Sequence, residues 1–391
     1  MIDYLYEAEQ RYDEIRTLRR RLHENAEIGF DVVQTNKIIN EELSRIGLVG
    51  KSCGRGGIIC DIGNSEDDKI LLRADIDALS MNEESGVSFS CKTGRMHSCG
   101  HDMHASMLLG AASIIKANES ELKRGVTLLF QPAEEILEGA QDCMKHIDTS
   151  IYSACYAVHV LCGVDLPRSA IVVPTRQITA LGADFFTITL HGESAHGATP
   201  HIGANAIDAA CGVISNIHGL LDGELPKTKG VIINIGKIIG GDAANAIADK
   251  VEIAGNIRYM DYSRRDEIID RLNYLSKQTA LLYDCEAKLE INAGCPPLRI
   301  SKELSNNFLS YSKLIFKNVF SDVELGSVKD SVGGSEDFAN FTDKIPGLLI
   351  SICAGSTKDG YTYPLHNPKI VFDESALITG MAVYSSVALE K

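Results

Sequence analysis

Short runs of continuous apolar residues alternate with helical patterns in the first part of the chain. Runs of strand length lie at 69–75, 125–132 and 154–160, and apolar positions recur at helical spacing over 104–118 and 373–389. Continuous apolar runs are typical of strands buried on both faces of a parallel sheet. The alternation predicts an α/β domain in which helices flank a mainly parallel sheet.

The pattern changes near residue 181, where apolar and polar positions begin to alternate. Strands are predicted at 184–192, 230–238, 250–260 and 286–294, and helices at 204–221 and 263–283. The order strand, helix, strand, strand, helix, strand is that of a split βαβ, ferredoxin-like α+β domain. We therefore expect one domain formed by 1–181 and 294–391, interrupted by a small domain at 182–293.

Composition narrows the possible partners. The chain has 391 residues, of which 45% are hydrophobic, and its formal charge is -15. Acidic residues outnumber basic ones 53 to 38, which argues against nucleic acid as a partner because phosphate binding needs clustered Lys and Arg. The one basic run, at 16–24, is predicted to be a solvated helix face.

Neither a signal peptide nor a membrane span is predicted. The N-terminal 30 residues are charged and helical in pattern, and no apolar run approaches the roughly 20 residues that span a bilayer. The eleven cysteines are scattered without a Cys-x-x-Cys pair, so a disulfide framework is not expected. These features favour a cytoplasmic protein.

Residues 96–105, "MHSCGHDMHA", concentrate groups that bind metals. Thiolate and imidazole are good ligands for zinc and other first-row divalent ions, and a structural zinc site would need a close Cys pair that the chain lacks. Several such residues fall at or just after predicted strand ends, where open α/β sheets place ligand sites. They are Asp75, Asp77, Cys99, His101, Glu134, Glu135 and His159.

Consecutive carboxylates at Glu134 and Glu135 can point in different directions, one toward a metal and one toward a water molecule. Taken singly, each signal has an ordinary explanation: a solvated surface pair, a loop with a buried thiol, or a histidine in the core. Their joint occurrence at strand ends indicates a metal site.

Nine ordered motifs between Arg16 and Glu390 carry a resemblance to a known family. They are "LRRRLHENAEIGF", "LLRADIDAL", "MHSCGHDMHA", "FQPAEE", "HV", "HGESAHGATPH", "GGDAANAIADKVEIAGNIR", "GGSEDFANF" and "HNPKIVFDE". The chain resembles the aminoacylase and carboxypeptidase family of two-metal amidohydrolases. Within it, the chain is similar to the branch of hippurate hydrolases, auxin-conjugate (IAA-amino acid) hydrolases and N-acyl-L-amino acid amidohydrolases.

The resemblance implies a role for each matching residue. A pair of divalent metals (Zn, Mn, Ni or Co) would be held by Cys99, His101, Glu135, His159 and His366. Glu134 would be the general base, and Asp77 would orient the metal site. Asp75 lies where carboxypeptidase relatives have a metal histidine and is placed outside the ligand set. For His104, helix packing or a hydrogen bond to the site is favoured over direct ligation.

The resemblance also makes the small domain at 182–293 a lid and dimerisation domain, and 1–181 with 294–391 the catalytic metal-binding domain. From the lid, His196 would steady the oxyanion, and Asn245 and Arg258 would contact the substrate, with Arg258 paired to an α-carboxylate. Closure around the substrate and a homodimer or higher homo-oligomer are expected. Ser80, Ala248 and Asn256 depart from the usual motifs, but none replaces a ligand or the base.

The implied reaction is hydrolysis of the amide bond of an N-acyl amino acid or peptide by metal-activated water. An aromatic acyl group, an acetyl chain, a diaminopimelate derivative and a dipeptide all fit the catalytic set. Two rival hypotheses stay open. A cysteine hydrolase with Cys99 as nucleophile predicts activity that survives chelation, and a metal-free binding protein on the same fold predicts no activity.

Overall fold

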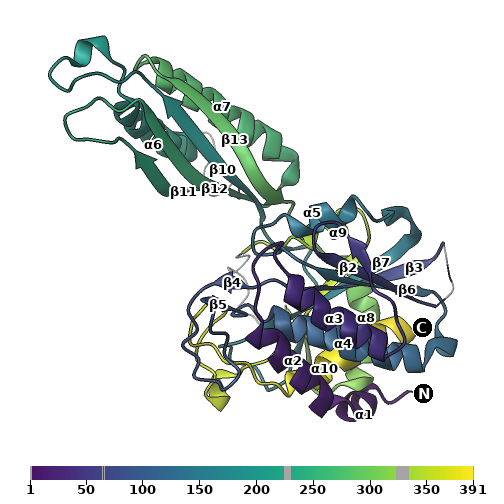
Figure 1. The fold of residues 1–391 in the computed structure, drawn as a ribbon. Coiled ribbons are helices and arrows are strands. Elements are labelled where there is room, and N and C mark those ends of the chain that lie inside the picture. Colours follow the sequence, from purple (N-terminus) through teal and green to yellow (C-terminus); the bar gives the residue numbers. More distant parts are fainter. Residues whose placement is uncertain (1, 64, 66, 224–229, 323–333, 391) are drawn as a thin grey trace. The chain divides into compact units, whose positions relative to one another are not determined.

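The structure is a computed structural model that describes residues 2–63, 65, 67–223, 230–322 and 334–390. It divides into two compact units (Figure 1). The large unit consists of Met1–Thr179, Arg299–Val332 and Asp337–Lys391, and the small unit of Ala180–Leu298 and Gly333–Glu336. Gly333, the first residue of the "GGSEDFANF" motif, lies outside the described residues.

An eight-stranded sheet forms the centre of the large unit, in the order β1-β2-β6-β3-β7-β16-β8-β15. The strands are β1 (Lys51–Cys53), β2 (Gly57–Ile62), β3 (Lys69–Asp75), β6 (Gly125–Gln131), β7 (Tyr152–Leu161), β8 (Ile171–Val173), β15 (Val319–Ser321) and β16 (Gly347–Cys353). The four central strands β6, β3, β7 and β16 are parallel, while β1, β2 and β8 join by antiparallel pairing. The predicted α/β fold with a mainly parallel sheet is confirmed.

The helices of the large unit flank this sheet (Figure 1). They are α1 (Tyr4–Glu9), α2 (Tyr12–Glu24), α3 (Val33–Arg45), α4 (His101–Ala117), α5 (Gly139–Met144), α8 (Lys302–Ile315), α9 (Ala339–Thr342) and α10 (Ala376–Leu389). Two further short strands, β4 (Leu79–Ser80) and β5 (Arg95–Met96), pair with each other.

Helices α4 and α10 pack closely because each presents a glycine to the other. A Cβ atom at Gly110 would lie 2.2 Å from the Met381 sulfur, and one at Gly380 would lie 2.1 Å from the Met107 sulfur. Nearly every residue of both helices is buried. This contact holds α4, which begins at His101, firmly in the core.

The prediction of a solvated basic face at 16–24 is wrong for part of α2. Arg20 and Arg21 are half exposed, but the Arg19 side chain is only 3% exposed and its Nε lies 2.7 Å from Asp102 Oδ2. His23 is buried beside the same carboxylate. Because α2 lies against α4, one side of the basic run faces buried acids rather than water.

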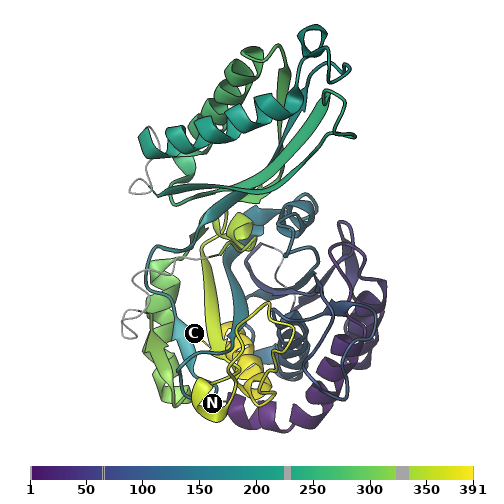
Figure 2. The ribbon, with the colours of Figure 1, turned by 90° about the vertical axis from the view of Figure 1, so that its left-hand side faces the viewer.

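The small unit has the predicted order of elements. Its strands are β10 (Gly182–His191), β11 (Val231–Gly240), β12 (Lys250–Tyr259) and β13 (Glu286–Cys295), and its helices are α6 (Ala206–Gly223) and α7 (Arg265–Leu281). The sheet is antiparallel in the order β11-β12-β10-β13, and both helices cover one face of it (Figure 2). A continuous apolar core between sheet and helices makes this unit a compact body.

Two short strands near the unit boundary, β9 (Ile178–Ala180) and β14 (Leu298–Arg299), form a separate two-stranded sheet. Among the helices that the structure describes, none has both the length and the apolar character needed to cross a bilayer.

Candidate metal centre

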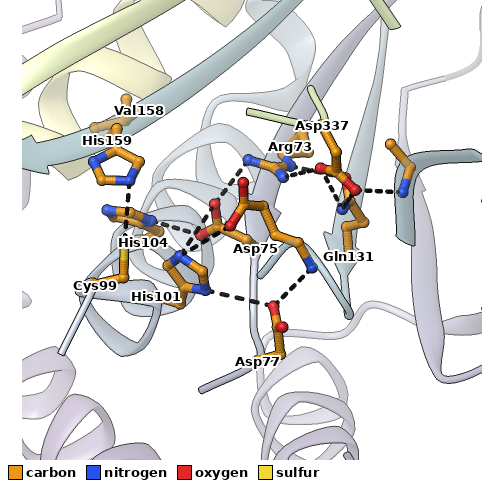
Figure 3. A network of polar contacts seen from close by, with 12 residues as sticks. Arg73, Asp75, Asp77, Cys99, His101, His104, Gln131, Val158, His159 and Asp337 are labelled. Carbon is orange, nitrogen blue, oxygen red and sulfur yellow. Dashed lines mark hydrogen bonds and ion pairs between the residues drawn. The ribbon is translucent and has the colours of Figure 1, made fainter. Parts of the chain in front are cut away.

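The predicted site residues of the large unit gather at the carboxyl ends of the parallel strands. Figure 3 shows five of them, Asp75, Asp77, Cys99, His101 and His159. Asp75 is the last residue of β3, Glu134 and Glu135 follow the end of β6, and His159 lies near the end of β7. His101 is the first residue of α4. Because parallel strands end on the same edge of a sheet, these separate segments supply their side chains to one place.

All five predicted ligands come together in this cluster. The Cys99 sulfur lies 3.6 Å from His159 Nε2, and Glu135 Oε1 lies 3.8 Å from His101 Nε2 and 3.5 Å from His366 Nε2. Their donor atoms form two groups, Cys99–His101–His159 and Cys99–Glu135–His366, each within 4.8 Å. The two groups share the thiol.

Gly100 allows the turn that brings the thiol and the first histidine together. Its φ is +88°, a conformation that suits glycine, and a Cβ there would lie 2.3 Å from Val160 Cγ2 of β7. The start of α4 therefore packs directly on the strand that carries His159. This contact links the two halves of the Cys99–His101–His159 group.

The donor atoms fit divalent metal ions. His101 Nε2 and Glu135 Oε1 are buried and have no hydrogen-bond partner among the described residues, an arrangement that is costly unless another group contacts them. The Nδ1–H of His159 donates to the Val160 carbonyl at 2.8 Å, which leaves the Nε2 lone pair facing the cluster. Burial lowers the pKa of His159 to about 3, so the ring is neutral, as a ligand must be.

Burial raises the pKa of the Cys99 thiol above its usual value. Metal binding at this site must therefore displace a proton from sulfur. A set of one thiolate, three imidazoles and a carboxylate is suited to first-row divalent metal ions.

Asp77 holds the loop that carries both glutamates. Its carboxylate oxygens accept from the backbone N–H groups of Glu134 at 3.0 Å and Glu135 at 3.3 Å, and Oδ1 lies 3.5 Å from His101 Nδ1. Ala133 has a φ of +58°, a conformation that non-glycine residues rarely adopt. This sharp turn and its buried anchor position Glu134 with its Oε2 atom 3.8 Å from His101 Nε2.

His104 is buried and both of its ring nitrogens are occupied. The backbone N–H of Val160 donates to Nε2 at 2.9 Å, and Nδ1 lies 2.5 Å from Asp75 Oδ1. No lone pair is left for a metal. The contacts agree with a hydrogen-bonding role for His104 beside the site.

Sequence reasoning missed a buried arginine beneath the cluster. Arg73 is 1% exposed and lies 2.8 Å from Asp75 and 2.9 Å from Asp337. Asp337 also accepts hydrogen bonds from Gln131 and from the backbone N–H of Ala140. An arginine inside the apolar run "KILLRAD" was the available signal, because a charge on a strand buried on both faces needs a partner.

His196, predicted to steady the oxyanion, and Asn245, predicted to contact the substrate, lie on paired loops of the small unit and are exposed. The Gly197 N–H donates to the Asn245 carbonyl at 2.8 Å. The Ala198 N–H donates to His196 Nδ1 at 3.0 Å, so the neutral ring carries its proton on Nε2 and can donate it to a ligand.

Arg258 projects from β12 of the same unit and is partly buried. Its Nη1 contacts the Ser335 hydroxyl, and its Nε donates to Asn256 Oδ1 at 3.3 Å. These contacts leave donors on the guanidinium available for a carboxylate. The ligand cluster belongs entirely to the large unit and does not include these three residues.

Residues 71–390 match the sequence profile of peptidase family M20/M25/M40. The chain is 30% identical over 389 residues to IAA-amino acid hydrolase ILR1-like 2 of Arabidopsis thaliana, covering 97% of this chain and 85% of the relative. It is also 30% identical over 365 residues to N-acetyl-L-cysteine deacetylase of Bacillus subtilis, covering 92% and 84%.

The fold agrees with these sequence matches. A solved dinuclear metal-binding peptidase of the M20 family from Bacillus subtilis has a TM-score of 0.75 and 25% identity, over 97% of this chain and 98% of that one. The profile match alone spans more than half of the sequence. The chain therefore belongs to peptidase family M20/M25/M40 and is a hydrolase of that family.

Proposed function

We propose that the protein hydrolyses the amide bond of N-acyl amino acids and releases a carboxylic acid and a free amino acid. The observation that carries the proposal is the cluster of five metal-binding side chains with Glu134 beside it. Two similar proteins are named for the hydrolysis or deacylation of N-acylated amino acids, which supports this substrate class.

Two divalent ions would be held by Cys99, His101, Glu135, His159 and His366, with Cys99 common to both donor groups. When bound, such ions lower the pKa of water to about 7 and polarise an amide carbonyl. Cys99 would hold an ion as the thiolate, and His159 would hold one as the neutral ring that its Val160 contact selects.

Glu134 is the residue proposed to move protons. Its carboxylate lies beside the ligand cluster on a loop held by Asp77, close enough to take a proton from a water molecule in the cluster. The same proton then passes to the nitrogen of the leaving amine, so Glu134 ends the cycle as it began.

The small unit supplies the proposed substrate contacts. His196 donates its Nε2–H to the oxygen that becomes negative as the carbonyl is attacked. Arg258 binds the α-carboxylate of the amino-acid product half through its remaining N–H groups, and Asn245 contributes a polar amide beside His196. In this proposal the small unit acts as a lid over the bound substrate.

A substrate panel tests the proposal. N-acetyl, N-benzoyl and indole-acetyl amino acids, an N-acetylated diaminopimelate and a dipeptide would be assayed after chelation and after return of Zn, Mn, Ni or Co. We expect activity that disappears with chelator, returns with a metal and favours N-acyl amino acids. Preference for the dipeptide would make the protein a dipeptidase or carboxypeptidase, activity that survives chelation would make Cys99 the nucleophile, and no activity with any metal would favour a binding protein.

We place the protein in the cytoplasm as a homodimer formed through the small unit. None of the eleven cysteines, all of which are described, forms a disulfide bond, which suits a reducing compartment. The edge strand β11 exposes Ile232, Ile238 and Ile239, which suits a contact with a second copy. Light scattering after gel filtration should give twice the chain mass, and a single-chain mass would rule the dimer out.

A further inference from the structure

Strand β7 loses one of its neighbours just before it reaches the ligand cluster. The pairing of β3 with β7 ends at Arg73 opposite Ala157. Beyond this point, side chains take up two backbone N–H groups of β7. Val158 donates to the Tyr384 hydroxyl at 3.0 Å, and Val160 donates to His104 Nε2 at 2.9 Å. A buried amide without such a partner would destabilise the fold.

The Val160 peptide groups connect two imidazoles. Its N–H donates to His104, and its carbonyl accepts from His159 Nδ1 at 2.8 Å. The two rings also touch, with their centroids 4.5 Å apart. On its other side, His159 Nε2 faces the Cys99 sulfur at 3.6 Å (Figure 3).

Asp75 forms the far end of this chain of contacts. Its Oδ1 lies 2.5 Å from His104 Nδ1, and its Oδ2 lies 2.8 Å from Arg73 Nη1 (Figure 3). Because the amide of Val160 can only donate, His104 Nε2 must accept, and the ring proton sits on Nδ1 facing Asp75. Arg73 stabilises the charge that keeps Asp75 an acceptor.

We propose that Asp75 and His104 are positioning residues that orient the metal ligand His159 through the backbone of Val160. His104 holds the backbone N–H of Val160, and the carbonyl of the same residue then fixes the plane and tautomer of the His159 ring. The inference rests on the proposed metal site, and it assigns to His104 a function other than ligation.

Two substitutions at one position separate this role from the alternatives. His104→Gln keeps an amide oxygen near the place of Nε2, where it can accept from Val160. His104→Asn keeps an amide N–H near the place of Nδ1, where it can donate to Asp75, but loses the acceptor for Val160. Ser106→Ala is the matched control, since Ser106 is a buried polar residue of the same helix whose hydroxyl donates to the Asp102 carbonyl.

The measurement is a titration of the chelator-treated full-length protein with Co²⁺ alone, in competition with a chromogenic chelator and without substrate. Removal of a group that orients a ligand typically weakens metal binding by about 10- to 100-fold. We expect that loss in His104→Asn, together with an altered Co²⁺ absorption spectrum at saturation. His104→Gln and Ser106→Ala should bind like the native protein.

Equal weakening in both His104 variants would overturn the inference in favour of ligation or packing, and native affinity in both would remove the positioning role. Circular dichroism recorded before the titration shows whether each variant is folded, so that a loss of affinity is read only from folded protein. If the native protein itself binds no Co²⁺, the proposed metal site fails rather than the role of His104.

Discussion

The Asp77 carboxylate accepts a hydrogen bond from the backbone N–H group of Glu134, with 3.0 Å between Oδ1 and N. The same oxygen lies 3.5 Å from His101 Nδ1. One buried carboxylate therefore contacts both the loop of the proposed base and a proposed metal ligand. This relationship couples the orientation of the base to that of the metal site.

Glu134→Gln should abolish most of the activity without emptying the metal site. The amide has nearly the same shape but cannot accept a proton, and general acid–base catalysis is typically worth about 10²- to 10⁴-fold in rate. Steady-state kinetics of the metal-loaded variant, with metal content measured in parallel, would check this. Glu135→Gln is the contrasting variant because it should lose metal as well as activity, and a fully active Glu134→Gln protein would disprove the assignment of the base.

Metal binding should stabilise the folded protein. The buried His101 Nε2 and Glu135 Oε1 atoms have no hydrogen-bond partner among the described residues, so an ion that contacts them binds the folded state. At a free concentration about 100 times the dissociation constant, one such ion adds about 2.7 kcal/mol to the free energy of unfolding. Thermal unfolding with chelator and with returned Zn²⁺ should show the shift, while Cys99→Ala should show little of it.

Arg258→Ala should raise KM for N-acyl amino acids far more than for neutral N-acyl amides. A charge-assisted hydrogen bond contributes about 1.5–3 kcal/mol, which corresponds to about 10- to 150-fold in KM. Arg258→Lys should recover only part of this, because lysine cannot form a two-pronged contact with a carboxylate. Comparable losses for charged and neutral substrates would refute the carboxylate contact.

The stability of the large unit should depend on the ionisation of His23. This side chain is buried, with Nδ1 2.8 Å from Asp102 Oδ2 and Nε2 3.2 Å from both Glu83 oxygens. Burial alone lowers the pKa of His23, but the two carboxylates outweigh it and raise the pKa above its usual value. Because its pKa is raised, the contribution of His23 to the free energy of unfolding is fully present below about pH 6.5 and is lost as pH rises through the folded-state pKa.

Glu83 makes the stability depend on pH in the opposite direction, at low pH. Burial acts to raise its pKa, but its contacts with His23 and Ser85 hold the pKa below the usual value. The contribution of Glu83 to the free energy of unfolding is therefore present above about pH 4.3 and is lost as pH falls.

Urea unfolding of the metal-free protein between about pH 5 and pH 8.5 tests the role of His23. The free energy of unfolding should decline on the alkaline side, and His23→Asn should remove this decline. An unchanged decline in the variant would contradict the prediction.

The sequence by itself determined the secondary structure that builds the site. The apolar run at 69–75 coincides with β3, and the run at 125–132 covers β6, because strands buried on both faces admit few polar residues. The ordered motifs carried the resemblance to the family, and that resemblance implied the five candidate ligands. The change of hydrophobic pattern near residue 181 marked the start of the small unit, whose sheet is antiparallel.

Only the tertiary structure decided which polar residues face each other across the core. The sequence predicts that Arg19 is solvated like the rest of its basic run, yet it pairs with Asp102, which is 83 positions away. Arg73 meets Asp337 across 264 positions, and the nitrogens of His104 are occupied by Asp75 and by a backbone amide of β7. The hydrophobic pattern of a segment shows whether it forms a helix or a strand and which of its positions are polar. The partner of a buried charge or imidazole depends on which segments the fold brings together, and spacing along the chain does not contain that information.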